Sequence, residues 1–117
     1  MSTLPHSPSP TISDDSLEKA LNWLRDHAGV IGKAKERAVK AEHMLKHIEA
    51  LEFKMSEGKS AEARKADART SPRYLEAITE DAVAAGEYER LRALREAAAL
   101  KIEAWRSEQA NFRALKI

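Results

Sequence analysis

The stretch SPRYLEAITEDAVAAGEYERLRALREAAALKIEAWRSEQANFRAL, residues 71–115, decides the fold of this chain. Ser71 and Pro72 predict a helix start, because a serine hydroxyl caps free backbone amides and proline fits the first helical position. Beyond them only Gly86 interrupts a run of residues that favour helix. A single helix over 72–115 would be about 65 Å long at 1.5 Å per residue. A helix of this length needs a partner helix, from this chain or from another.

The composition agrees with a protein of long helices. Of the 117 residues, 33% are charged and 5% aromatic, and Ala, Glu, Lys, Arg and Leu dominate, which is typical of coiled coils. The net charge of +1 gives no overall field toward nucleic acid or membranes. Cysteine is absent, which excludes disulfides and thiolate sites and fits a reducing cytosol. No apolar run approaches the roughly 18 residues that cross a membrane, and the N-terminus lacks the features of a secretory signal.

The N-terminal half predicts two helices. Residues 1–12, rich in Pro and Ser, are expected to be a disordered tail. Ser13 is the expected cap of a short first helix at about 14–28, with Asp15 and Glu18 as an alternative capping box. Gly29 then predicts a break, because glycine suits the position just after a helix end. A second helix is expected at about 30–57.

The link between the halves is expected to be a short helical tip. Gly58 ends the preceding helix, Ser60 caps a third helix at about 61–69, and the fourth helix occupies about 72–115. We therefore predict one all-α domain over residues 13–117. Its fold is an antiparallel helical hairpin, or coiled coil, with a short N-terminal helix and a helical tip.

Apolar residues recur at alternating three- and four-residue steps, the pattern of helices with one buried face. In the N-terminal half the expected buried residues are Leu17, Leu21, Leu24, Ala28, Ile31, Ala34, Ala38, Ala41, Leu45, Ile48, Leu51 and Met55. In the C-terminal half they are Leu75, Ile78, Ala82 and Ala85, then, after a shift of stripe near Gly86, Tyr88, Leu91, Leu94, Ala98, Ile102, Trp105 and Phe112. Many of these residues are alanine, so the helices approach closely but bury little apolar area.

Charge pairing predicts a register for the hairpin. The segment 76–89 contains acids but no Lys or Arg. In the expected register Lys54 faces Glu76 and Lys46 approaches Glu80. Pairs of this kind would hold the two long helices side by side.

The small apolar area between the two long helices predicts that the protein does not act alone. One hairpin seam leaves several apolar side chains without cover: Trp23, Val39, Val83, Leu100, Trp105 and Phe112. We expect a homo-oligomer, a protein partner, or both. Trp and Arg dominate interface hot spots, so the candidate interface residues are Trp23, Trp105, Arg106 and Phe112. In the expected register Trp23 falls opposite the region of Trp105.

The sequence predicts no enzyme. His43 and His47 share a helix face at a spacing that suits a metal ion, but no third ligand accompanies them, so no metal is expected. No glycine-rich phosphate loop is present, and two alanine-lined helices offer no enclosed site for a nucleophile. No cofactor is expected.

The tip is the candidate contact with nucleic acid or a partner. Its basic residues are Lys59, Arg64, Lys65, Arg69 and Arg73. We expect the last four to escape pairing within the chain, because the acids of the seam begin only at Glu76. Such cations can neutralise phosphates, although no aromatic residue is present there for base stacking. The alternative is that the tip is merely solvated.

Several motifs resemble small helical proteins from the early regions of tailed phages and prophages. They lie at residues 17–24, 71–74, 87–92, 97–98 and 102–107, with IEAWRS the most specific. Genes for such proteins often stand beside those for single-strand annealing recombination proteins. This chain departs from them in its Ser-Pro tail, in Gly29 and Gly32, and at Ala93, where an aromatic residue often stands.

The resemblance implies a setting rather than a mechanism. It implies a non-enzymatic accessory protein of phage recombination or replication that binds other proteins, with single-stranded DNA as a further partner, in the cytoplasm of a host bacterium. Two alternatives stay open. One is a phage inhibitor of a host nuclease or defence complex, and the other is a structural coiled-coil oligomer.

Overall fold

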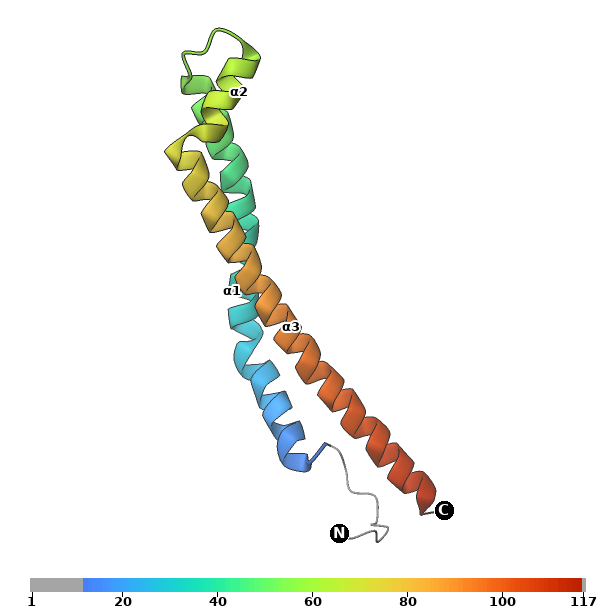
Figure 1. Cartoon of the computed structure of the whole chain (residues 1–117). Coiled ribbons are helices and arrows are strands. Elements are labelled where there is room, and N and C mark those ends of the chain that lie inside the picture. Colours follow the sequence, from blue (N-terminus) through green and yellow to red (C-terminus); the bar gives the residue numbers. More distant parts are fainter. Residues whose placement is uncertain (1–11, 117) are drawn as a thin grey trace, which may run out of the picture. The chain divides into compact units, whose positions relative to one another are not determined.

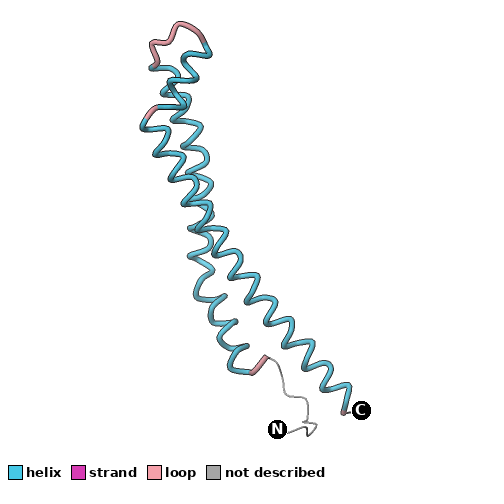
Figure 2. Tube along the Cα trace, viewed as in Figure 1, coloured by secondary structure: helices cyan, strands magenta, loops and turns pink. Residues whose placement is uncertain are grey.

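Residues 12–116 are described by a computed structural model and form three α-helices (Figure 1). The helices are α1 (Asp14–Met55), α2 (Ala61–Thr70) and α3 (Pro72–Leu115). Residues 56–60 and residue 71 form the loops between them (Figure 2). The long helices α1 and α3 pack antiparallel with α2 between them in sequence, so the predicted all-α hairpin is confirmed. The expected disordered tail lies, apart from Ile12, outside the described residues.

The chain divides into two compact units, and α1 and α3 each contribute a segment to both. The terminal unit contains Met1–Ala28 and Ala93–Ile117, and the central unit is Gly29–Arg92. In the terminal unit the backbone amide of Ile12 donates to Glu108 at 3.2 Å. In the central unit Arg37 of α1 pairs with Glu80 of α3. The expectation of a single domain stays a prediction.

Serine caps begin all three helices. The hydroxyl oxygens of Ser13, Ser60 and Ser71 accept hydrogen bonds of 3.0, 3.0 and 3.1 Å from backbone amides three residues later. Each bond satisfies a donor that the first helical turn leaves free. The helix starts predicted from these serines are therefore confirmed.

The break predicted near Gly29 is absent. The segments expected at 14–28 and 30–57 form one continuous helix, so the short N-terminal helix is the first part of α1. Neither Gly29 nor Gly32 has a positive φ angle, and both are exposed. Ile31 between them is only 5% exposed. Burial of this side chain offsets the roughly 1 kcal/mol by which each glycine weakens a helix relative to alanine.

A heptad pattern runs along both long helices. On α1 the buried and half-buried seam residues are Leu17, Ala20, Leu24, His27, Ile31, Ala34, Ala38, Ala41, Leu45, Ile48 and Glu52. On α3 they are Ala77, Asp81, Ala84, Tyr88, Leu91, Ala98, Ile102, Trp105, Gln109 and Phe112. The steps alternate between three and four residues, as in coiled coils, except that the exposed Arg95 takes the position between Leu91 and Ala98.

The stripe predicted for the first part of α3 is wrong. Leu75 and Ile78 are 52% and 40% exposed, whereas Ala77 and Ala84 are 8% and 0% exposed. One heptad continues from Ala77 to Phe112, so no shift of stripe occurs at Gly86. The sequence pattern favoured the bulkier residues, but the small ones let the backbones approach.

The tip is more tightly built than a connector. The Ser56 hydroxyl donates to Asp67 at 2.6 Å and accepts from the Gly58 amide at 3.0 Å. Arg64 donates to the Gly58 carbonyl at 3.2 Å and lies over the ring of Phe53, 5.9 Å from its centre. These contacts fold α2 back along the end of α1.

This fold-back corrects the predicted register. Arg73, at the start of α3, lies 3.6 Å from Glu52 of α1, and Glu80 pairs with Arg37 rather than Lys46. The acid Glu80 therefore pairs with a residue nine positions, or about two and a half helical turns, earlier on α1 than expected. Because α2 returns alongside α1 before α3 begins, α3 starts opposite an earlier part of α1.

Replacing the exposed helix glycines should stabilise the protein. A Cβ at Gly29 or Gly32 would meet no atom within 4 Å, so Gly29→Ala and Gly32→Ala should each raise the free energy of unfolding by about 0.5–1 kcal/mol. Gly58→Ala is the matched control, because its Cβ would lie 2.9 Å from the Arg64 backbone nitrogen and should destabilise. Denaturant melts followed by circular dichroism measure all three. A loss of stability in the first two variants would contradict a continuous α1.

Candidate protein-binding site

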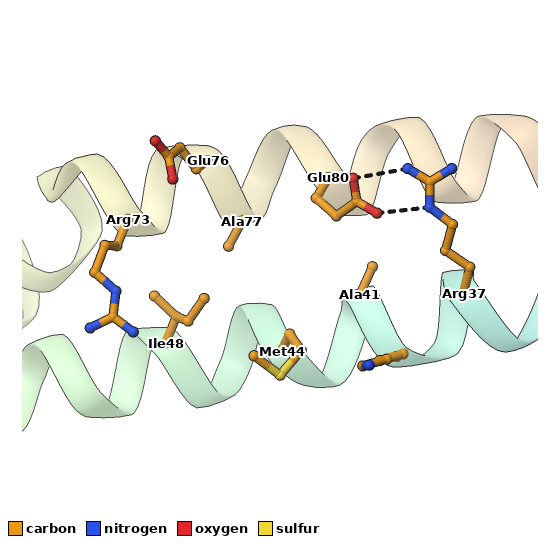
Figure 3. Close-up of a pocket in the computed structure, with 9 residues that line it drawn as sticks. Arg37, Ala41, Met44, Ile48, Arg73, Glu76, Ala77 and Glu80 are labelled. Atoms are coloured by element: carbon orange, nitrogen blue, oxygen red, sulfur yellow. Dashed lines mark hydrogen bonds and ion pairs between the residues drawn. The ribbon is translucent and has the colours of Figure 1, made fainter.

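An open groove of about 460 Å³ lies between α1 and α3 in the central unit (Figure 3). Its floor is apolar and consists of Ala41, Met44, Ile48 and Ala77. Its ends and rims are charged and consist of Arg37, Lys40, Arg73, Glu76 and Glu80. An apolar floor within a polar rim is the common anatomy of a protein interface.

The groove exists because the seam residues here are small. Ala41 and Ala77 are 5% and 8% exposed, and neither reaches far enough to fill the space beside the seam. Met44 lies just off the seam and is 41% exposed, while Ile48 is half-buried. The thioether of methionine is flexible and adapts to the shape of a partner. The floor is therefore an apolar surface that the hairpin itself does not cover.

An ion pair between the helices closes one end of the groove. Arg37 Nε and Nη2 donate to the two carboxylate oxygens of Glu80 at 2.8 and 3.0 Å (Figure 3). This hydrogen bonding lowers the pKa of Glu80 from its ordinary value and raises that of Arg37. Both side chains are half exposed, so the pair contributes little to stability and mainly positions the helices.

The rims carry two charges that the hairpin does not pair. Arg73 lies at the other end of the groove and pairs with Glu52. Lys40 on the α1 rim and Glu76 on the α3 rim have no ion-pair partner among residues 12–116. Glu76 points away from α1 (Figure 3). The groove therefore has one positive and one negative rim.

The cations predicted at the tip are largely engaged within the central unit. Arg69 pairs with Glu49 at 3.1 Å, and Arg73 pairs with Glu52. Arg64 donates to the Gly58 carbonyl, as described above. The expectation that Arg69 and Arg73 escape pairing is wrong, because the return of α2 brings Arg69 and the start of α3 to acids on α1. Contact between the tip and nucleic acid stays a prediction.

Two basic residues at the tip remain exposed. Lys59 and Lys65 have no ion-pair partner within the described part of the chain. They are the tip cations that a phosphate could reach without breaking an existing pair.

The predicted interface residues lie in the terminal unit, where the structure gives most of them local partners. Trp105 Nε1 donates to Asp14 at 3.1 Å, and Arg106 pairs with Glu103 at 2.9 Å. Trp23 stacks on His27, with ring centres 4.2 Å apart. Trp23, Trp105 and Phe112 are all half-buried, so each keeps some exposed surface.

Trp23 and Trp105 do not face each other. Trp23 lines a small groove with Leu94, Ala98 and Lys101, whereas Trp105 reaches the start of α1. The expectation that they lie opposite each other is wrong for the same reason as the register. Their role in a partner or oligomer interface stays a prediction.

The sequence alone did not indicate the groove. It placed Ala41 and Ile48 on the buried stripe but put Ala77 off it, so the α3 side of the floor was missed. The available signal was the heptad spacing of Ala77 with Ala84 and Leu91.

Other site types find no support within residues 12–116. No group of three or more His, Cys, Asp or Glu side chains there could hold a metal ion. None of the helices in that part of the chain has an apolar stretch of the length that a bilayer crossing requires. Comparison of the chain with protein-family models, curated proteins and solved structures gave no match.

Removing a paired arginine at the tip should cost stability, whereas removing a solvated lysine should not. Arg69→Ala and Arg73→Ala should each lower the free energy of unfolding by about 0.2–1 kcal/mol, because they leave Glu49 and Glu52 without partners. The controls Lys59→Ala and Lys65→Ala should change it by less than about 0.5 kcal/mol. Thermal melts measure all four variants, and equal effects in both sets would show that the arginine pairs are not formed in solution.

Proposed function

We propose that this chain is a non-enzymatic protein that acts by binding another polypeptide through the groove of the central unit. The observation that carries the proposal is the solvent-open apolar floor, with Met44 at 41% exposure between two interhelical ion pairs. A helix laid along two antiparallel helices would cover this floor with its apolar face. Its polar residues would meet the charged rims.

The charges of the site favour protein over nucleic acid as the ligand. The groove is bordered by both signs of charge. Arg37 pairs with Glu80, Arg73 pairs with Glu52, and Glu76 offsets Lys40, so the groove has no excess of positive charge to hold a phosphate backbone.

At the tip, the arginines already neutralise acids of α1. A phosphate that bound Arg69 or Arg73 would therefore have to compete with pairs that the fold makes, and Lys59 and Lys65 are the two tip cations that it could reach without doing so.

The groove chemistry supports binding rather than catalysis. Its ionisable groups are exposed, and Arg37 and Glu80 hold each other in their charged states. A general acid or base works best with a pKa near the working pH, which these shifts move further away. The floor contributes only apolar contact.

The resemblance to early-region phage proteins supplies the setting of the proposal. In that setting the protein acts in phage recombination or replication in the cytoplasm of the host. An inhibitor of a host nuclease or defence complex would use the same groove, so the identity of the bound partner separates the two roles.

The test is site-specific photo-crosslinking in cells that make the protein together with the rest of the phage or prophage. A benzophenone amino acid replaces Met44 in the groove. The matched control replaces Glu36, which is exposed on α1 away from the groove lining. A discrete adduct should form from position 44 and be much weaker from position 36, and mass spectrometry should identify its polypeptide. Absence of any polypeptide adduct at position 44, or equal labelling from both positions, would overturn the proposal.

A substitution in the floor gives an independent measurement. Met44→Glu places a carboxylate in the apolar floor and should weaken partner binding about tenfold or more, because the charge must lose water on binding. The melting temperature should change little, since Met44 is already substantially exposed. Loss of folding in this variant, rather than loss of binding, would contradict the assignment of Met44 to a binding surface.

A further inference from the structure

We propose that the polypeptide that fills the groove is a second copy of this chain. The inference rests on the proposed function and names its partner. In the dimer, two central units pack groove to groove, with α1 of one copy against α3 of the other, and form a four-helix bundle.

The first argument is the length of the uncovered face. On α1 the exposed residues Val30, Met44 and Met55 are separated by about four and three helical turns, so they share one side of the helix with the groove. On α3, Val83 lies two turns beyond Glu76, on the same side, and is 52% exposed. The groove is thus the middle of a longer face on which these apolar residues alternate with charged ones, such as Lys33 and Lys54 on α1 and Glu87 on α3, each a whole number of heptads from a residue of the groove rim.

This face is large enough for a dimer. From Val30 to Glu52, which pairs with the start of α3, α1 covers about 33 Å, and two helices side by side are about 20 Å wide. The face therefore measures about 660 Å² on each copy, charged rims included, and the total of about 1,300 Å² lies at the lower end of the roughly 1,200–2,000 Å² of stable interfaces. The groove floor alone is too small to support such an association.

The second argument is that the rims complement themselves. Lys40 and Glu76 each lie about one helical turn from the Arg37–Glu80 pair, both toward the tip of the hairpin. The two residues therefore have about the same position along the helix axes. A two-fold axis parallel to the helices brings α1 of one copy over α3 of the other. Lys40 then meets Glu76 of the second copy, and the symmetry makes this contact twice.

A second copy fits these rims better than an unrelated helix. A foreign partner would need acids along one side and bases along the other at matching levels. The second copy carries that pattern by symmetry, on the same two helices that bring the apolar face.

Charge exchange at the rims tests the proposal on the purified full-length protein. Sedimentation equilibrium should show a dimer for the wild type at micromolar concentrations. Lys40→Glu and Glu76→Lys each turn both rim contacts from attraction to repulsion and should raise the dimer dissociation constant about tenfold. Lys46→Glu is the matched control, because it makes the same charge change on α1 outside the groove lining and should leave the constant unchanged.

Mixing the two variants gives the decisive measurement. In a heterodimer of Lys40→Glu with Glu76→Lys, every rim contact again joins opposite charges. The equimolar mixture should therefore associate about as tightly as the wild type, although each variant alone does not. Circular dichroism of each variant checks that the helices persist.

Each remaining outcome decides against the inference. It is overturned by a wild type that stays monomeric at about 100 µM. It is also overturned by rim variants that dimerise like the wild type, or by a mixture as weak as its components. If position 44 of a monomeric wild type still crosslinks to a different polypeptide, the proposed function stands and only the self-association fails. If position 44 crosslinks to no polypeptide at all, both fail.

Discussion

Close approach of α1 and α3 on alanine is the constraint on which the rest of this structure depends. Six of the eight buried apolar residues are alanine, and no large side chain is fully buried within the described part of the chain. Alanine at a heptad seam lets two backbones come together but removes little apolar surface from water. The two long helices therefore have a well-defined arrangement but bury little apolar surface between them. Larger side chains such as Met44 and Leu75 stay partly exposed.

The same small seam leaves much of the alignment of the helices to polar contacts. Along α1, the pairs of Glu49 with Arg69, Glu52 with Arg73 and Arg37 with Glu80 join it to α2 and α3. Individually such exposed pairs add little free energy. Together they fix the register that a uniform row of alanines would leave free to slide.

The groove between α1 and α3 follows from this division of roles. Where small residues meet, the space beside the seam is left open, and unpaired charges stand at its edges. A surface with an apolar floor and one rim of each sign is costly to leave in water yet specific in what it accepts. The proposed function by association follows from how the hairpin is held together.

The sequence by itself determined the helices, their serine caps and the hairpin topology. These depend on local chemistry, since a serine caps the amides three residues later and a proline prevents the preceding helix from continuing. The tertiary structure decided the continuity of α1 through Gly29, the burial of Ala77 in place of Ile78, and the register. It also decided that Arg69 and Arg73 pair with acids of α1, because only the folded tip shows that α2 returns along α1. Contacts between residues far apart in the chain select one alignment among several that have the same periodicity, and the periodicity cannot distinguish them.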